Sequence, residues 1–463
     1  MALLITTASA AGVPVPMAEG PLVDSARQGT LVWNVDKLGY VAEEYLISGR
    51  ADVFDAVAMA DAVDMTARDT PKDMAARDSY SRVVLKAAEP YITRIIVYRP
   101  EDPARFSGNV VVETAHPLQG GLAIVWSQIS GYFAQHGDIY VGIAHPVTFA
   151  SLRASNPSRY GQLSAVDPTQ LWGMIAQVGA LIKAGGSASP LRRFQVKALF
   201  LTGYSYTGVA ATTFADFHHE SVRLADGRPI FDGYLSMANS MYVRPIDVPV
   251  IRLMTQSDFN SFGGLNNRRP DSDAPGSRFR LWEVAGASHL NASPVIEPAA
   301  EPWIPAAAML EPPNLPHFSA SECSKSFPSG FGPNTLPLNY VMVSAFEHLY
   351  AWVRSGTPPP HAALIATNQD GSVKTDSNGN AIGGLRLPDI AVPAASYGTG
   401  AGSCFLFGYR QPYGAALMKS LYGTRAHYVA ELSAEVRSQV RQGWLRAQEA
   451  AKIEQAVPRS EAF

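Results

Sequence analysis

The chain has 463 residues, of which 47% are hydrophobic and 17% are charged, and its formal net charge is −3. This much apolar material fills the core of either one enlarged domain or two to three average domains. A nearly neutral charge balance lacks the basic surplus of nucleic-acid-binding proteins, and no apolar run approaches the roughly 20 residues that span a bilayer. Composition therefore predicts a soluble globular protein that binds no nucleic acid and has no membrane span, and it leaves the oligomeric state open.

The start of the chain, MALLITTASAAGVPVP, contains a short apolar segment followed by an Ala8-Ser9-Ala10 tract that resembles a signal-peptidase site. It lacks the cationic residues that normally precede such a segment, and its apolar part is short. A trimmed export signal and a plain flexible arm both fit these features.

Two cysteines occur, Cys323 and Cys404. Neither lies in a C-x-x-C motif or near a histidine at zinc-ligand spacing, so no metal site is expected. A disulfide between them favours an oxidising compartment, whereas two unrelated buried thiols do not. We favour the disulfide, and with it a secreted or periplasmic location over a cytoplasmic one, but both alternatives stay open.

Apolar runs and segments of helical period alternate along the chain. Residues 1–90 predict an N-terminal arm and an irregular region packed on the core. The expected strands are 91–98, 109–113, 139–143, 196–201, 232–236, 248–254 and 278–284. Helical patterns fall at 122–135 and 169–183. Strands that alternate with helices predict an α/β fold with a mostly parallel, doubly wound sheet flanked by helices, and residues 91–290 form its core.

Two segments follow this core. Residues 291–335 are rich in proline and aromatic residues without a clear period, and they predict a lid-like insertion that includes Trp303. Residues 336–463 are expected to form the C-terminal part of the same domain, a helical extension with amphipathic patterns at 338–354 and 424–452. The aromatic residues of the lid either line a substrate pocket or pack in the core.

The stretch Val196 to Gly208, VKALFLTGYSYTG, combines a buried strand, a sharp turn and the start of a helical pattern. A serine at the tip of such a turn is typical of a nucleophile elbow, in which a strained backbone projects the hydroxyl clear of the sheet. Ser205 stands at this tip. Thr207 replaces the glycine that is commonest two residues after the serine, so the motif is G-x-S-x-x-G. An ordinary strand-to-helix turn is the alternative.

A serine hydroxyl needs a base within hydrogen-bond reach before it acts as a nucleophile. In this type of fold the partners follow in the order Ser, acid, His, at the carboxyl ends of later strands. Asp258 follows the strand that ends at Met254, and His289 follows the strand that ends at Val284. We therefore expect Asp258 to orient His289, and His289 to take the proton of Ser205. The alternatives are a helix or turn cap for Asp258 and a surface loop position for His289.

The tetrahedral intermediate of such a reaction needs backbone N–H donors, which form an oxyanion hole. The amide of Tyr206, next after the serine, is the expected first donor, and Ala115 or His116, after the strand 109–113, is the expected second. No cofactor is expected, because no glycine-rich phosphate loop follows an early strand. The candidates for the substrate pocket are Tyr204, His116, His145 and Trp303.

Six blocks of the chain carry a family resemblance. They are Gly39–Tyr45, Arg94–Val97, Pro103–Gly108, Leu281–His289, Gly383–Arg386 and Cys404–Gly408. These blocks resemble a family of bacterial and fungal alpha/beta hydrolase domain proteins, and the similarity runs from about residue 20 to 450. It implies an α/β-hydrolase fold with Ser205, Asp258 and His289 at the triad positions, and the cysteine pair also resembles one in such relatives. The chain departs at Tyr206, where the family tends to carry Gln, and at Gln256, where an acidic residue is usual.

These features predict a serine hydrolase that cleaves a small-molecule or polymeric carboxylic ester through an acyl-enzyme. The first alternative is the same triad acting on an amide, thioester, lactone or polyester, because pocket shape sets that preference. The second is a non-catalytic binding protein on the same fold, although such a protein has no need of all three residues in register. Tyr204 and Tyr206 beside the nucleophile favour a bulky apolar or aromatic group in the substrate.

Overall fold

The computed structural model describes residues 12–23, 35–55, 83–116, 123–262, 267–290, 330–399 and 406–456. Most of the predicted lid, with Trp303, lies outside these ranges. Cys323 and Cys404 also lie outside them, so their pairing stays a prediction. None of the helices within these ranges is long and apolar enough to cross a membrane.

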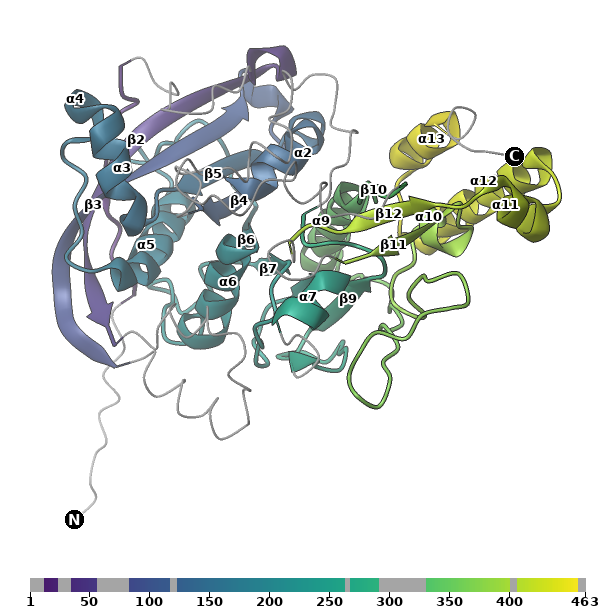
Figure 1. The fold of residues 1–463 in the computed structure, drawn as a ribbon. Helices are drawn as coiled ribbons and strands as arrows, with labels where there is room; N and C mark the ends of the chain where they lie inside the picture. The colour runs from purple at the N-terminus through teal and green to yellow at the C-terminus, as the bar shows by residue number, and fades with distance from the viewer. Residues whose placement is uncertain are drawn as a thin grey trace.

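A sheet of nine strands runs through the described part of the chain (Figure 1). Its strands are β1 (Met17–Glu19), β2 (Tyr40–Phe54), β3 (Val84–Pro100), β4 (Asn109–Thr114), β5 (Ile139–Ile143), β6 (Ala198–Tyr204), β7 (Gly233–Met237), β8 (Val250–Thr255) and β9 (Phe279–Val284). Their order across the sheet is β1-β2-β3-β5-β4-β6-β7-β8-β9. The pairs from β1 through β3 to β5 are antiparallel, and all pairs from β5 to β9 are parallel.

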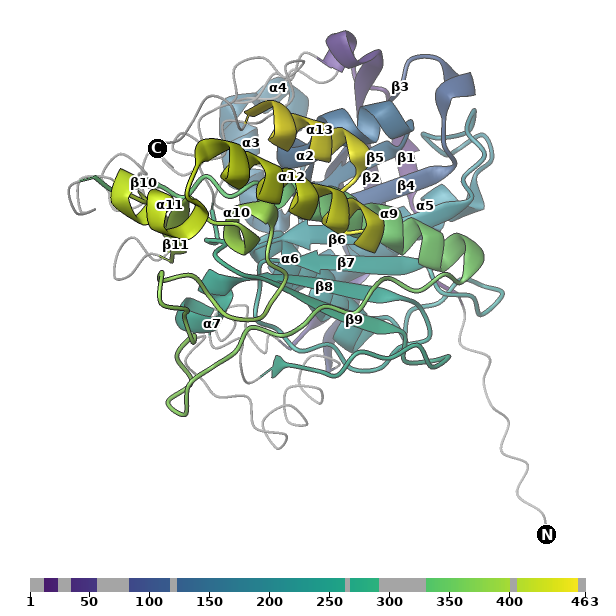
Figure 2. The same ribbon diagram turned by 90° about the vertical axis from the view of Figure 1, so that its right-hand side faces the viewer.

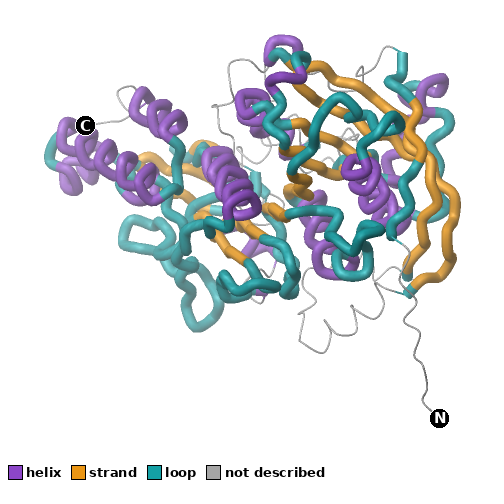
Figure 3. The backbone as a smooth tube through the Cα atoms, turned by 180° about the vertical axis from the view of Figure 1, so that it is seen from behind, coloured by secondary structure: helices purple, strands orange, loops and turns teal. Residues whose placement is uncertain are grey.

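Helices pack against both faces of this sheet, as Figure 3 shows from behind. On one face, α2 (Ile124–His136) and α9 (Leu338–Ser355) share a core with Val111. On the other face, α5 (Leu171–Ala184) and α6 (Tyr206–Thr213) share a core with Val110 and Val112. Successive residues of β4 thus serve opposite cores, because side chains alternate along a strand, and each buried apolar side chain contributes roughly 1.5–3 kcal/mol. The predicted doubly wound α/β fold is confirmed.

Short helical segments connect these elements. They are η1 (Val35–Leu38), η2 (Pro103–Arg105), η3 (Pro146–Thr148), α3 (Phe149–Ser155), α4 (Pro157–Tyr160), η4 (Pro168–Gln170), η5 (Phe214–His218) and α7 (Gln256–Phe262). The predicted strands at 109–113, 139–143 and 278–284 agree with β4, β5 and β9 to within one residue at each end. The predicted helix at 424–452 is two helices, α12 (Arg425–Gln442) and α13 (Ala447–Ala456), because Gly443 takes a φ of 82° and ends α12.

The expectation of an irregular region before residue 90 is corrected by β2, which pairs with β3 along most of its length. Charged residues interrupt the apolar pattern of β2, so the sequence does not predict a strand there. Glu44 is nevertheless 0% exposed, because it forms ion pairs with Arg94 of β3 at 2.7 Å and with Arg159 at 2.5 Å. A carboxylate that is buried by partners far along the chain has no local signal of burial.

Apart from α9, the chain after residue 330 lies at the end of the molecule opposite β2 and β3 (Figure 1), and this end faces the viewer in Figure 2. It contains a second sheet with the order β10 (Gly332–Pro333), β12 (Tyr409–Pro412), β11 (Ala395–Gly398), and the helices α10 (Pro388–Ala391) and α11 (Ala415–Tyr422). The Ala285 amide donates to the Leu385 carbonyl at 3.0 Å, and the Leu290 amide donates to the Leu406 carbonyl at 2.8 Å. These bonds join the C-terminal region to the loop that follows β9.

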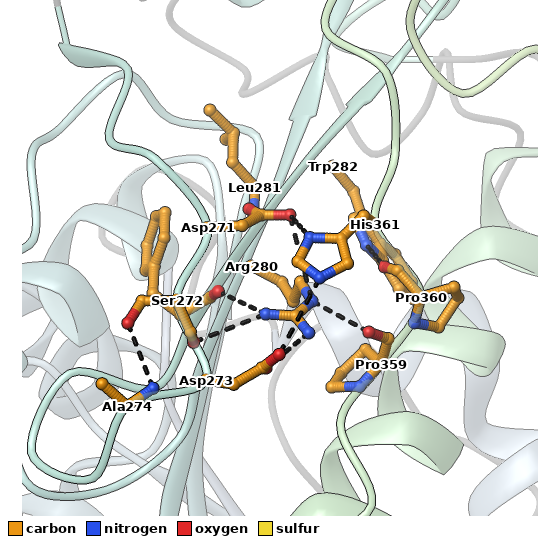
Figure 4. Close-up of polar contacts among 11 residues, drawn as sticks. Asp271, Ser272, Asp273, Ala274, Arg280, Leu281, Trp282, Pro359, Pro360 and His361 are labelled. Atoms are coloured by element: carbon orange, nitrogen blue, oxygen red, sulfur yellow. Dashed lines mark hydrogen bonds and ion pairs between the residues drawn. The ribbon is translucent and has the colours of Figure 1, made fainter.

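A polar cluster fixes β9 to the segment that follows α9 (Figure 4). Arg280 of β9 is 0% exposed, donates to the Pro359 carbonyl at 2.8 Å and forms an ion pair with Asp273 at 2.6 Å. In the same cluster, the Asp271 carboxylate lies 2.8 Å from Nδ1 of His361. Because the guanidinium is satisfied by these acceptors, a buried arginine is tolerated at this junction.

Candidate active site

Ser205 lies between β6 and α6 with a φ of 58° and a ψ of −125°, a backbone conformation that non-glycine residues rarely adopt. Close backbone contacts surround this turn. A Cβ atom on Gly203 would lie 2.0 Å from the Thr207 carbonyl oxygen, and a Cβ atom on Gly208 would lie 2.4 Å from the Met237 carbonyl oxygen. Side chains larger than glycine would therefore clash at both glycines of the G-x-S-x-x-G motif, because β6, α6 and β7 approach each other closely here.

Ser205, His289 and Asp258 form one chain of hydrogen bonds. The Nε2 atom of His289 lies 2.8 Å from the Ser205 Oγ, and its Nδ1 atom lies 3.0 Å from the Asp258 Oδ1. The Asp258 Oδ2 accepts from the Thr255 amide at 2.7 Å. His289 is 2% exposed and Asp258 is 0% exposed, so little water competes for these bonds. With a carboxylate at Nδ1, the imidazole carries its proton there and presents the Nε2 lone pair to the serine hydroxyl.

The loop that carries His289 is held by three further side chains. The Ser257 hydroxyl accepts from the His289 amide at 3.0 Å, and the Tyr204 hydroxyl donates to the His289 carbonyl. The Gln256 side-chain oxygen accepts from the Gly286 amide at 2.7 Å. Gln256 thus fastens the histidine loop at the position where the family resemblance implies an acid. Tyr204, a predicted pocket residue, is 1% exposed and supports the histidine from within the core.

Two histidines lie near Tyr206, the residue that follows the nucleophile. The ring centroids of His116 and His145 each lie 5.7 Å from that of Tyr206. Burial, with smaller contributions from His289 and His145, lowers the pKa of His116 to about 3, and burial lowers the pKa of His145 to about 4. Both imidazoles are therefore neutral at pH 7. His145 is 0% exposed and His116 is 8% exposed, so of the two only His116 has surface that a substrate can touch.

The structure separates the two predicted second donors of an oxyanion hole. The Ala115 amide donates to the Ile143 carbonyl at 2.6 Å, so the sheet already uses it. This bond corrects the expectation that Ala115 stabilises an oxyanion, and it leaves His116 as the candidate. Tyr206, the predicted first donor, begins α6, where first-turn amides have no acceptor within the helix. Within the described ranges, no three His, Cys, Asp or Glu side chains are grouped to hold a metal ion.

Glu113, at the end of β4, is a residue that reasoning from the sequence missed. It is 0% exposed, and its carboxylate accepts hydrogen bonds from the hydroxyls of Thr207 (2.7 Å) and Tyr140 and from the Val125 amide (3.1 Å). The signal available in the sequence is a single acidic residue that ends a run of three valines. Charged residues are almost never fully buried unless they are paired or bonded, so such a position deserves a search for partners.

A family model described as an alpha/beta hydrolase domain matches residues 11–455. The chain belongs to this alpha/beta hydrolase family. The fold predicted from the resemblance is thereby confirmed, and the protein belongs with the hydrolases.

Solved structures similar to this alpha/beta hydrolase include a serine hydrolase of Xanthomonas campestris described as lacking a lid, at 13% identity over 42% of this chain and 78% of that chain, with a TM-score of 0.27. A poly(3-hydroxybutyrate) depolymerase of Bordetella parapertussis matches with the same values. A thermophilic esterase of Thermogutta terrifontis matches at 11% identity over 41% of this chain and 77% of its own, with a TM-score of 0.26. No curated protein sequence matches the chain.

Proposed function

We propose that this alpha/beta hydrolase cleaves carboxylic esters by nucleophilic catalysis at Ser205. The observation that carries the proposal is the buried chain of hydrogen bonds from Asp258 through His289 to the Ser205 hydroxyl. A serine hydroxyl is a weak nucleophile at neutral pH, and a base that a carboxylate orients supplies the missing activation.

In the first half of the reaction, the Ser205 Oγ bonds to the ester carbonyl carbon while His289 Nε2 takes the hydroxyl proton. Asp258 stabilises the imidazolium that results. The negative charge on the carbonyl oxygen is met by the Tyr206 amide and by a second donor after β4, for which His116 is the candidate. When the intermediate collapses, the alcohol leaves with the proton from His289, and the acyl group stays on Ser205.

In the second half, His289 takes a proton from a water molecule, whose oxygen attacks the acyl carbon. Collapse of the second intermediate releases the carboxylic acid and returns the proton to Ser205. The reaction consumes the ester and one water molecule, and it returns the chain to its starting state.

The surroundings of the serine favour an uncharged group in the substrate. His116 is neutral at pH 7, and Tyr206 offers an aromatic ring beside the nucleophile. The proposed substrate is an ester of a small molecule or of a polymer, and the same chemistry also cleaves an amide, thioester or lactone. A panel of esters that varies the acyl chain and the alcohol separately, with matched amides and thioesters, tests the preference.

The substitution Ser205→Ala tests the proposal. We expect it to lower kcat on a short p-nitrophenyl ester by at least about a thousandfold, with a remnant from the rest of the site, and to leave the melting temperature nearly unchanged. A variant that kept wild-type turnover would refute the role of Ser205.

Labelling with a fluorophosphonate separates an enzyme from a binding protein on the same fold. The enzyme reacts at Ser205, and the Ser205→Ala variant does not react. A wild-type protein that stays unlabelled and hydrolyses no ester in the panel favours the binding protein.

A further inference from the structure

We propose that Glu113 is a positioning residue for this reaction. Its carboxylate bonds to the nucleophile turn, to the start of α2 and to β5, and so fixes where the Ser205 hydroxyl stands relative to these elements. The inference rests on the proposed role of Ser205 as the nucleophile.

Glu113 is bonded to three elements at once. Its Oε1 atom lies 2.7 Å from the Thr207 hydroxyl of α6, and its Oε2 atom accepts from the Tyr140 hydroxyl of β5. The Val125 amide, in the first turn of α2, donates to the same carboxylate at 3.1 Å. The candidate donor His116 stands between β4 and α2 in the sequence, so one carboxylate links the two elements on either side of it to the elbow.

Thr207 carries the restraint to the backbone on both sides of Ser205. Its hydroxyl oxygen accepts from the Tyr204 amide at 2.8 Å, and its proton has two acceptors in reach, the Glu113 carboxylate at 2.7 Å and the Tyr204 carbonyl at 2.9 Å. An ionised carboxylate is the stronger acceptor, so it takes the proton. Tyr204 and Thr207 flank Ser205, and holding both keeps the serine at its φ of 58°.

The surroundings of Glu113 are unusual for a buried acid, because no arginine, lysine or histidine among the described residues forms an ion pair with it. The groups that face it are the hydroxyls of Thr207 and Tyr140 and the amides of Val125 and Trp126. A neutral side chain would be cheaper to bury at this position. All four groups donate hydrogen bonds, so the site is built for the ionised carboxylate rather than for a protonated acid that must itself donate.

Titration of Glu113 gives the proposal a readout that packing alone lacks. Burial raises the pKa of Glu113 to about 7, against the hydrogen bonds from Tyr140 and Thr207, which lower it. Burial and the charge of Glu113 hold the pKa of Tyr140 well above its usual range, so Tyr140 stays a donor. When Glu113 takes up a proton, the carboxyl can no longer accept from all of its donors, and the elbow loosens.

The central experiment compares the wild-type protein with Glu113→Gln, which keeps the size of the side chain and removes its charge. We expect kcat on a p-nitrophenyl ester and the rate of fluorophosphonate labelling at Ser205 to fall about tenfold or more, with KM changed by less than about threefold. The acid limb of the kcat/KM profile should become shallower, since the ionisation of Glu113 no longer contributes to it. Wild-type kcat with an unchanged acid limb would overturn the proposal.

Glu44→Gln is the matched control, because Glu44 is an equally buried acid of the same sheet but bonds Arg94 and Arg159 instead of the elbow. It should lower the melting temperature and leave the shape of the acid limb intact. If Glu44→Gln and Glu113→Gln lower kcat and change the profile alike, Glu113 has no particular role.

Two variants of Thr207 keep the test open should Glu113→Gln fail to fold. Thr207→Val removes the hydroxyl at nearly constant volume, whereas Thr207→Ser keeps it. The proposal expects the valine variant to lose about tenfold in kcat and the serine variant to stay close to wild type. Equal values for the two variants would overturn it.

Amide hydrogen exchange distinguishes a failure of this inference from a failure of the proposed function, because it needs no turnover. We expect exchange of the Tyr204 amide to be faster in Glu113→Gln than in the wild-type protein, whether or not esters are cleaved. If the wild-type protein cleaves esters but this exchange is unchanged, the positioning role is excluded. If it cleaves none and the exchange still rises, the network stands and the assigned chemistry does not.

Discussion

Four histidines in the described part of the protein form a close pair with an aspartate, and two of them, His289 and His361, have a similar Nδ1–carboxylate distance. Nδ1 of His289 lies 3.0 Å from Asp258, and Nδ1 of His361 lies 2.8 Å from Asp271. Their surroundings differ. The His289 side chain is 3% exposed and its Nε2 faces the Ser205 hydroxyl, whereas the His361 side chain is 61% exposed and its Nε2 lies 3.9 Å from a second carboxylate, that of Asp273.

The comparison shows that an aspartate–histidine contact by itself makes no base. The second nitrogen must face a group that can give up a proton to a reaction, and water must be kept from the pair. His289 meets both conditions, while the exposed side chain of His361 joins the cluster around the buried Arg280 (Figure 4). The following experiments test this contrast, from the largest expected effect to the smallest.

The largest difference in activity is expected between the alanine variants of His289 and His361. His289→Ala removes the proposed base, and we expect kcat/KM on a p-nitrophenyl ester to fall by about three to four orders of magnitude. His361→Ala should leave it within about twofold, because that side chain is remote from the serine. Parallel steady-state assays of the two purified variants measure the difference, and equal losses would break the comparison.

Replacing each aspartate by asparagine tests orientation rather than proton transfer. In Asp258→Asn the amide cannot hold the imidazole in the tautomer that the reaction needs, so kcat should fall by about a hundredfold to ten-thousandfold with little change in KM. Asp271→Asn should leave kcat near the wild-type value. If Asp258→Asn behaves like Asp271→Asn, the acid has been assigned to the wrong residue.

The burial of His116 makes the stability of the protein depend on pH. The pKa of His116 is about 3 in the folded protein and about 6.5 in the unfolded chain, so unfolding takes up a proton between these values. His116 therefore weakens the fold as pH falls below about 6.5, by up to about 1.4 kcal/mol per pH unit. Urea unfolding at pH 7, 6 and 5 should show a flatter pH dependence for His116→Gln than for the wild-type protein.

Comparing the two proteins shows whether His116 causes this pH dependence of the free energy of unfolding. Glu113 and His145 also titrate differently in the folded and unfolded states, but they contribute alike to both proteins and cancel in the comparison. An identical slope for the wild-type protein and the variant would show that His116 is charged or solvated in the folded state.

The smallest effect is expected for the stability of the exposed pair. His361→Ala should change the free energy of unfolding by less than about 1 kcal/mol, because an ion pair with a solvent-exposed partner gains little over hydration. Urea unfolding at pH 7 measures it. A loss several times larger would mean that the cluster around the buried Arg280 depends on His361.

The candidate site was more predictable from the sequence than the groups that support it. Ser205, Asp258 and His289 each follow a short apolar run, and the carboxyl ends of parallel strands meet at one edge of a sheet. Local sequence patterns were therefore enough to predict the residues of the site. Glu44 and Glu113 escape such patterns, because the groups that make their burial tolerable lie far away along the chain.

The second sheet also escapes prediction, for a different reason. Its strands span two to four residues, from β10 (Gly332–Pro333) to β11 (Ala395–Gly398). A period of two residues cannot be recognised over so short a length, and β10 pairs with β12, which lies far along the chain. The exact donors around Ser205 depend on such contacts too, which is why Ala115 and His116 could be told apart only from the hydrogen bonds.

Two backbone hydrogen bonds hold the His289 loop, from Ala285 to Leu385 and from Leu290 to Leu406. They have a consequence for the order in which the chain folds during synthesis. A ribosome delivers the nucleophile, the acid and the base in that order, and only much later the segments that grip the base. The nascent chain thus carries every reacting group before it can hold them in register. Until synthesis has passed Leu406, the loop that carries His289 lacks both of these backbone bonds.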